Sequence, residues 1–268
     1  MVKDYDFFAF MSPLKIGKQI FIFTGERPSL SIPSLPGMVP NFTGRQSECE
    51  EIIGHVTSES TRLVSIWGSP GFGKTSVAIA VGHNLQSKGM PVCWVSLREL
   101  KSKSDLVSKL LSFVKPSVRD DHPSFSQPSL DDQLCLLLSE ISDRSIFILD
   151  NADNLLEDGE PGVKKEVIGL LKEILMRSKA TIFALTTRES LGFLNVDLQG
   201  HQSVRIRPLD EDSAKTLVKA LLPTASSSDC TRILQICGFV PLAIKLLCSS
   251  ISEGQTFQPI TPNISFVP

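Results

Sequence analysis

Short apolar runs alternate with amphipathic segments through the middle of the chain. The apolar runs have the length and composition of buried strands and lie at residues 63–67, 92–97, 145–150, 181–187 and 203–207. Apolar residues between the runs recur at helical spacing in the segments 75–88, 104–114, 130–142 and 162–177. This alternation predicts an α/β fold with a parallel five-stranded sheet flanked by helices on both faces.

The pattern changes after Pro208. Three helical segments follow with no strand-like run between them: Asp210–Leu222, Asp229–Cys237 and Pro241–Ile251. A helical unit of about 45 residues is too small to hold a large core alone, so we expect it to pack on the α/β domain. The expected divisions are a leader or linker at 1–37, an α/β domain at 38–208, a small C-terminal helical lid subdomain at 209–252 and a coil tail at 253–268.

The leader ends in a segment rich in proline and serine, Pro28–Pro36. Proline fits neither a helix interior nor a central strand, so we expect this part of the chain to be poorly ordered.

Composition narrows the function classes. The chain has 268 residues, of which 41% are hydrophobic and 21% charged, as in a soluble globular protein. Its formal net charge of −2 and the absence of a basic run give no electrostatic reason to expect nucleic acid or a membrane surface as a partner. The six cysteines contain no C-x-x-C pair and mostly lie in apolar stretches, which indicates free thiols and a cytoplasmic location.

Residues 68–75 read Gly-Ser-Pro-Gly-Phe-Gly-Lys-Thr and match the phosphate-binding pattern G-x-x-x-x-G-K-[ST] in full. Glycines let the backbone N–H groups of such a loop turn inward, the lysine reaches the β- and γ-phosphates, and the threonine hydroxyl is a ligand for Mg²⁺. A strand-like run precedes the loop and a helical segment follows it, so the phosphates would meet a helix N-terminus. The predicted nucleotide-binding residues of this segment are Gly68, Gly71, Phe72, Gly73, Lys74, Thr75 and Ser76.

An apolar strand ends in a carboxylate at Asp150. P-loop enzymes use a carboxylate in this position, opposite the loop threonine, to hold Mg²⁺, so we predict that Thr75 and Asp150 are the metal ligands. The next residue is Asn151, which cannot accept a proton from an attacking water. Asp153 is the candidate substitute for the missing base.

Arg188 follows the expected strand 181–187, at the edge of the sheet where the phosphates would lie. Its guanidinium could contact a γ-phosphate, or it could be a surface group paired with Glu189, and the sequence leaves both alternatives open. Pro241 opens the last helical segment, at a position where its missing N–H group costs nothing.

Taken in order, these segments resemble the NB-ARC family, the nucleotide switch of apoptosis and innate-immune signalling proteins within the STAND class of ATPases. The segments that carry the resemblance are Asn41–Arg45, the P-loop, Val92–Leu97, Leu149–Asn151, Thr186–Arg188 and Gly238–Ala243.

The resemblance implies that Val39, Asn41 and Arg45 border the adenosine, that Arg188 senses the γ-phosphate and that Pro241 packs on the adenine. It also implies Mg²⁺ with ADP or ATP as the ligands, and protein partners or self-association through regions outside this chain. The resemblance identifies the chain as a fragment or a reduced member of the family, since it stops where such proteins continue into a winged-helix subdomain and repeats.

Three functions follow from these observations. The first is an adenine-nucleotide switch with slow or no hydrolysis, because Asn151 replaces the second acidic residue of many relatives. The second is a turnover P-loop ATPase or a small-molecule kinase. The third is an interaction module that has lost nucleotide binding, which the intact Lys74, Thr75 and Asp150 disfavour.

Overall fold

A computed structural model describes residues 13–16, 19–22, 29–32, 34–115, 129–156, 162–191 and 200–253. The coil tail expected at 253–268 lies outside these residues except for Glu253, as does most of the leader expected at 1–37. In the described part of the chain, no helix is long and apolar enough to cross a membrane.

Five parallel strands form the central sheet in the order β5-β7-β8-β4-β9, which confirms the predicted fold class. Their bounds are β4 Leu63–Trp67, β5 Val92–Ser96, β7 Ser145–Asp150, β8 Thr181–Thr187 and β9 His201–Arg205. Four of them lie within one residue of their expected positions, and β9 begins at His201 instead of residue 203. Because β8 lies between β4 and β7, three strands end side by side at the carboxyl edge of the sheet.

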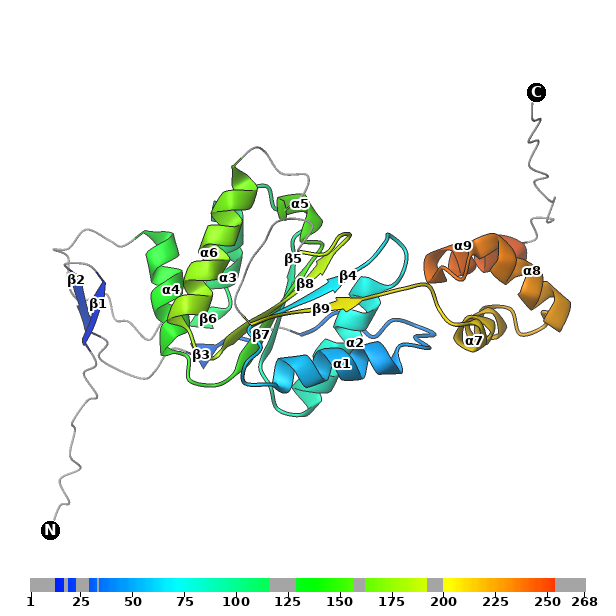
Figure 1. Ribbon diagram of the computed structural model, residues 1–268, viewed down its shortest axis with the longest axis horizontal. Coiled ribbons are helices and arrows are strands. Elements are labelled where there is room, and N and C mark those ends of the chain that lie inside the picture. The colour runs from blue at the N-terminus through cyan, green and yellow to red at the C-terminus, as the bar shows by residue number, and fades with distance from the viewer. Residues whose placement is uncertain are drawn as a thin grey trace, which may run out of the picture.

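Helices cover both faces of the sheet, and side chains of each strand alternate between the two (Figure 1). In β7, for example, Phe147 and Leu149 face one core while Ile146 and Ile148 face the other. The first core is shared with α3 Lys103–Leu111, α4 Leu130–Glu140, α5 Asp153–Leu156 and α6 Val163–Arg177, and the second with α1 Gln46–Thr57 and α2 Lys74–Ser87.

The lid consists of three helices beyond β9 and has a small apolar core of its own. These helices are α7 Glu211–Leu221, α8 Ser227–Cys237 and α9 Pro241–Ser252. Asp210 and Ser226 cap α7 and α8 by accepting backbone N–H groups, and Gly238 ends α8 in the left-handed conformation. Figure 1 shows the lid at one end of the molecule, joined to β9 by a single segment.

The sequence did not predict α1 or α5. The α1 segment has polar residues along most of its length, with Ile52 and Val56 fully buried, and no side chain caps its start at Arg45. Its weak apolar pattern therefore conceals a helix that tertiary packing stabilises. The four-residue α5 is too short to show a helical period at all.

Part of the expected leader packs on the α/β domain. The β3 strand, Ser29–Leu30, pairs antiparallel with β6, Val114–Lys115. Farther along, Leu35 packs on the core beneath α2, and the His83 Nε2 atom lies 2.8 Å from the Pro36 carbonyl oxygen. The remaining described strands of the leader, β1 Pro13–Ile16 and β2 Gln19–Ile22, pair with each other.

Candidate nucleotide-binding site

The P-loop connects β4 to α2 at the carboxyl edge of the sheet, as the sequence predicted for a phosphate-binding loop. Gly68 has φ +150°, and a Cβ atom there would lie 2.3 Å from the Ile206 carbonyl oxygen, so this position requires glycine. Gly71 (φ +80°) and Gly73 (φ +96°) also have left-handed backbone conformations. Gly73 is the N-cap of α2, so the N-terminal N–H groups of that helix face the loop.

Lys74 is the first residue of α2, and its ammonium group curls back over the loop. The Lys74 Nζ donates to the carbonyl oxygens of Gly68 at 2.6 Å and Ser69 at 3.3 Å. The cation is therefore held inside the loop that would surround a phosphate. Ser76 follows in the first turn of α2, while Phe72 packs against the core beneath α1 and α2.

Two threonine hydroxyls meet the carboxylate of Asp150 at the end of β7. Thr75 Oγ1 donates to Asp150 Oδ1 at 2.9 Å, and Thr186 Oγ1 donates to the same oxygen at 2.7 Å. The structure thus brings the two predicted metal ligands, Thr75 and Asp150, into contact. Thr186, in β8, also accepts the backbone N–H of Asn151 at 2.8 Å.

Thr186 is a site residue that we did not predict. The sequence places it two residues before Arg188 but gives no sign of its contact with Asp150. The only available signal was its position in a strand that would neighbour the carboxylate, and that required knowledge of the strand order.

Asp153 and Arg188 form an ion pair beside this cluster. Asp153 is 3% exposed, its Oδ1 accepts the backbone N–H of Arg188 at 2.5 Å, and its Oδ2 lies 3.7 Å from the Arg188 Nε. Arg188 is half exposed and has an ion-pair partner in Asp153, which the sequence did not suggest. Asp153 is the first residue of α5. Two residues earlier, Asn151 has a left-handed backbone conformation (φ +61°).

The lid touches the P-loop through the start of α9. The backbone N–H of Leu242 donates to the Gly71 carbonyl at 3.3 Å, and a Cβ atom on Gly71 would lie 3.2 Å from the Leu242 Cβ. Pro241 is therefore adjacent to a residue in contact with the loop. Lys245, one turn later, has its Nζ 3.5 Å from the Pro40 carbonyl oxygen.

The segment before α1 lies between the P-loop and the lid. Val39 and Asn41 flank Pro40, and Asn41 has a left-handed backbone (φ +56°). Arg45 is buried, and its guanidinium donates to the Phe72 carbonyl at 3.0 Å and the Arg207 carbonyl at 2.7 Å.

The site fits a magnesium-bound nucleoside phosphate. Thr75 and Asp150 offer the hard oxygen atoms that Mg²⁺ prefers, and Lys74 offers a cation beside them. Gly68, where any Cβ atom would collide with the Ile206 carbonyl oxygen, lets the backbone make the close turn that a phosphate-binding loop needs. These residues would hold the phosphates and the metal, which supplies charge neutralisation on the phosphate oxygens.

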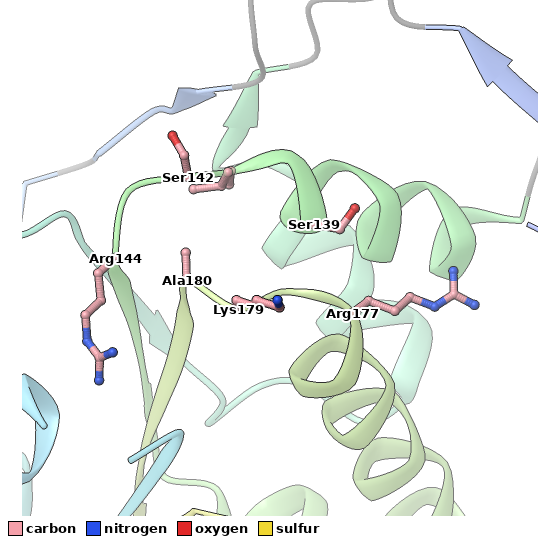
Figure 2. A pocket seen from close by; sticks show the side chains of 7 residues that line it. Ser139, Ser142, Arg144, Arg177, Lys179 and Ala180 are labelled. Atoms are coloured by element: carbon pink, nitrogen blue, oxygen red, sulfur yellow. The ribbon is translucent and has the colours of Figure 1, made fainter. Parts of the chain in front are cut away.

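A cavity of about 460 Å³ lies at the opposite edge of the sheet and contains none of these residues. Arg144 and Ala180, which line it, precede β7 and β8, so the cavity opens at the amino edge. Figure 2 shows Arg144 pointing away from Lys179. Its guanidinium donates to the carbonyls of Val56 at 3.0 Å and Thr61 at 3.2 Å, which is a structural role.

Solved structures of similar fold are P-loop NTPases. A signal transduction ATPase with numerous domains (STAND) protein of Pyrococcus horikoshii, with a tetratricopeptide repeat sensor, has a TM-score of 0.55 at 18% identity, over 85% of this chain and 32% of that one. A Walker-type ATPase of Pyrococcus abyssi has a TM-score of 0.60 at 16% identity, over 82% and 71%. The ORC1 protein of Aeropyrum pernix, solved in complex with DNA, has a TM-score of 0.55 at 18% identity, over 82% and 63%.

Two curated relatives are much longer than this chain. A WD repeat-containing protein of Nostoc sp. is 27% identical over 247 residues, which are 85% of this chain and 19% of the relative. The regulatory protein AfsR of Streptomyces griseus is 25% identical over 234 residues, covering 83% and 22%. The chain thus spans about a fifth of each relative's length.

The NACHT domain family matches residues 62–225, more than half of the 268 residues. The match begins just before the P-loop strand β4 and extends through α7 into the lid. It agrees with the STAND class expected from the motifs, although the family that matches is NACHT and not NB-ARC. The chain belongs to the NACHT family of STAND-class P-loop NTPases and carries its nucleotide-binding domain.

Proposed function

We propose that this chain is an adenine-nucleotide switch that binds ADP and ATP with Mg²⁺ and converts their exchange into a change in the relation of lid to core. The observation that carries the proposal is the contact of α9 with the P-loop at Gly71, beside the cluster of Lys74, Thr75 and Asp150. A ligand in the loop can favour one position of the lid only if the lid meets the loop.

Different residues of the site bind the phosphates and the cation. Lys74 and the N-terminal N–H groups of α2 attract the phosphates, while Thr75 and Asp150 hold the cation. Arg188 is half exposed at the end of β8, so its guanidinium can exchange Asp153 for a γ-phosphate oxygen. Since ADP has no γ-phosphate, this exchange would give the two nucleotides different affinities for the two states.

The adenosine assignment rests on the resemblance of the motifs. It gives Val39, Asn41 and Arg45 a place beside the adenosine and Pro241 a place on the adenine. Two observations support it. The segment that contains Val39 and Asn41 meets Lys245 of the lid at Pro40, and Pro241 directly precedes Leu242, whose N–H bonds the P-loop at Gly71.

We extend the proposal to a role in signalling, of the NB-ARC type found in innate immunity and apoptosis. It is supported by the names of two similar proteins, a signal transduction ATPase with a repeat sensor and a regulatory protein. Both are longer than this chain, so sensing and protein partners would reside in further domains.

We propose a cytoplasmic location, no membrane partner and no nucleic-acid partner. The net charge of −2 supports the last point, although two structures of similar fold contain DNA. The location is supported by the six cysteines, all of them in the described part of the chain and with free thiols.

A second candidate function is a turnover ATPase. It is favoured by Asp153, a buried carboxylate at the same edge of the sheet as Asp150. Against it, both oxygens of Asp153 face Arg188, so the carboxylate is positioned to hold the arginine and not a water.

Thermal melting with Mg-ADP tests nucleotide binding. A ligand at 100 times its dissociation constant stabilises the native state by about 2.7 kcal/mol, so the melting temperature of the wild type should rise by several degrees. Lys74→Ala should remove most of this shift. Lys88→Ala, at the other end of the same helix, is the matched control and should keep it. Equal shifts in the wild type and Lys74→Ala would contradict the phosphate-site assignment.

A further inference from the structure

Arg45 places a cation among three segments that are far apart in the sequence. Its guanidinium NH1 donates to Glu48 Oε1 at 2.6 Å, and its NH2 donates to both the Phe72 carbonyl (3.0 Å) and the Arg207 carbonyl (2.7 Å). Arg45 is 5% exposed, so these bonds form almost entirely out of water. A buried guanidinium needs such partners, and losing them leaves both the charge and the carbonyls unsatisfied.

The two carbonyl partners belong to the parts that a switch has to connect. Phe72 lies inside the P-loop, and Arg207 lies in the segment 206–210 that joins β9 to the lid. We call this segment the hinge. A single NH2 group therefore bonds the phosphate-binding loop and the hinge at once.

Close backbone packing surrounds this bridge. A Cβ atom on Gly68, the first P-loop residue, would lie 2.3 Å from the carbonyl oxygen of Ile206 in the hinge. A Cβ atom on Gly44, next to Arg45, would lie 2.2 Å from the Ser213 Cβ in α7. The Gly68 backbone therefore lies directly against Ile206, whose N–H also donates to the Trp67 carbonyl at 2.7 Å, so a shift at the start of the P-loop acts on the hinge.

We propose that Arg45 is a positioning residue that couples the P-loop to the hinge, so that the nucleotide state is transmitted to the lid through the Phe72 and Arg207 carbonyls. This inference rests on the proposed function. It adds a role to the place beside the adenosine that the resemblance gives Arg45, because the guanidinium also bonds two backbone carbonyls.

Hydrogen–deuterium exchange at the hinge tests the coupling. The Ile206 N–H donates to the Trp67 carbonyl at 2.7 Å, and the Leu209 N–H donates to the Phe239 carbonyl at 3.0 Å, so both amides should exchange slowly enough to follow. In the wild type, we expect their exchange rates to differ at least threefold between the Mg-ADP and the Mg-ATP-analogue complexes.

Arg45→Lys is the informative variant, because an ammonium group keeps the charge but lacks the planar fork that reaches several acceptors. This variant should abolish the difference in exchange rate between the two nucleotide complexes at the Ile206 and Leu209 amides. Its Mg-ADP affinity, measured by calorimetric titration, should fall by less than about tenfold, because only the coupling part of the binding free energy is lost. Arg144→Lys is the matched control. Arg144 also donates to backbone carbonyls, at Val56 and Thr61, but at the opposite edge of the sheet, and its substitution should leave the difference unchanged.

Glu48→Ala provides a second variant should Arg45→Lys fail to fold. It removes the carboxylate that orients Arg45 and should reduce the difference in exchange without removing a P-loop residue. A wild-type difference that persists in both variants would overturn the inference, as would a wild type that binds nucleotide with no change at the hinge. Loss of Mg-ADP binding in Arg45→Lys with unchanged hinge exchange would assign Arg45 to the adenosine and also overturn it. Absence of nucleotide binding in the wild type would instead contradict the proposed function.

Discussion

Asp150 is held by hydroxyl groups from two different elements, Thr75 at the start of α2 and Thr186 in β8. α2 packs against the sheet and β8 is one of its strands, so the carboxylate has little freedom to rotate. An oxygen ligand fixed in this way loses less entropy when it binds a cation. The order of the strands, with β8 between β4 and β7, is what brings Thr186 to the carboxylate.

We predict that Thr186→Val weakens magnesium-dependent nucleotide binding. The substitution removes a donor to Asp150 and leaves the N–H of Asn151 without its acceptor, which should lower the free energy of unfolding by about 1–3 kcal/mol. Thr186→Ser should restore both properties. Urea unfolding and Mg-ADP titration at several Mg²⁺ concentrations measure them.

Thr187→Val is the matched control for this prediction. Thr187 is equally buried, but its hydroxyl donates to the Glu189 carbonyl and not to Asp150. We expect a loss of about 1 kcal/mol in stability and no change in the dependence on Mg²⁺. The same Mg²⁺ dependence in both valine variants would show that Thr186 does not act through Asp150.

Arg188→Ala should weaken ATP more than ADP, because the proposed contact is with the γ-phosphate. A hydrogen bond to a charged group contributes about 1.5–3 kcal/mol, which corresponds to roughly 10- to 150-fold in affinity. Calorimetric titration of the two nucleotides decides the question. If both affinities fall alike, or neither falls, Arg188 has a structural role, such as its ion pair with Asp153.

Among the elements, those with a strong apolar period could be predicted and those defined by their contacts could not. β7 reads Ser-Ile-Phe-Ile-Leu-Asp, all of it buried, and its bounds were predicted at 145–150. The α1 helix, Gln46–Thr57, has few apolar residues and was missed, because its stability comes from packing on α2 and the sheet.

The residues of the site also divide into those that a local sequence pattern predicts and those that only tertiary contacts reveal. The P-loop, Asp150 and Arg188 lie in local patterns whose chemistry can be read from neighbouring residues. The contacts of Thr186 with Asp150 and of Arg45 with Arg207 span 36 and 162 positions, and they depend on which strands are neighbours. A sequence of one chain carries no direct record of that pairing.

The edge strand β9 contains a histidine whose titration should affect stability. His201 Nε2 lies 2.8 Å from Ser65 Oγ in β4, and burial lowers the pKa of His201 below its ordinary value of 6.5. Between the lowered pKa and about 6.5, the unfolded chain binds more protons than the folded one, so stability should rise with pH in that window. The stability that neutral His201 contributes is fully present above the pKa of this histidine in the unfolded chain. It is lost as the pH falls towards the lower pKa of His201 in the folded protein.

His201→Gln isolates this contribution from the other histidines. The glutamine amide can bond to Ser65 but does not titrate, so the difference in free energy of unfolding between the wild type and the variant should be constant above about pH 7.5 and should shift against the wild type below about pH 6.5. Urea unfolding at a series of pH values measures it. A difference that does not change from pH 5 to pH 8 would show that the β9 histidine has the same pKa in both states.

For the whole molecule, the lid has its own apolar core and meets the α/β domain through both backbone and side-chain contacts, at Gly71, Pro40 and Gly44. The Leu242 N–H of the lid donates to the Gly71 carbonyl of the P-loop. The Leu209 N–H of the hinge donates to the Phe239 carbonyl of the lid. Leu246 and Leu242, on one side of α9, are 62% and 50% exposed. A lid with an apolar core of its own can move as a body, which is the kind of motion by which domains close around a ligand.

A switch has to keep ATP in its site for much longer than an ordinary enzyme keeps a substrate. Asn151 cannot accept a proton and Asp153 is paired with Arg188. The rate of ATP hydrolysis should therefore be well below the median turnover rate of enzymes, roughly 10 s⁻¹. Single-turnover phosphate release from pre-bound Mg-ATP measures the rate. If Asp153 takes the proton after Arg188 moves to the γ-phosphate, Asp153→Asn should abolish the remaining turnover and leave ATP affinity nearly unchanged. Asn151→Asp should instead raise the turnover rate. A wild-type rate of several per second would contradict the slow switch and favour the turnover ATPase, because a molecule that converts ATP to ADP so quickly cannot hold the lid in its ATP-bound position long enough to signal.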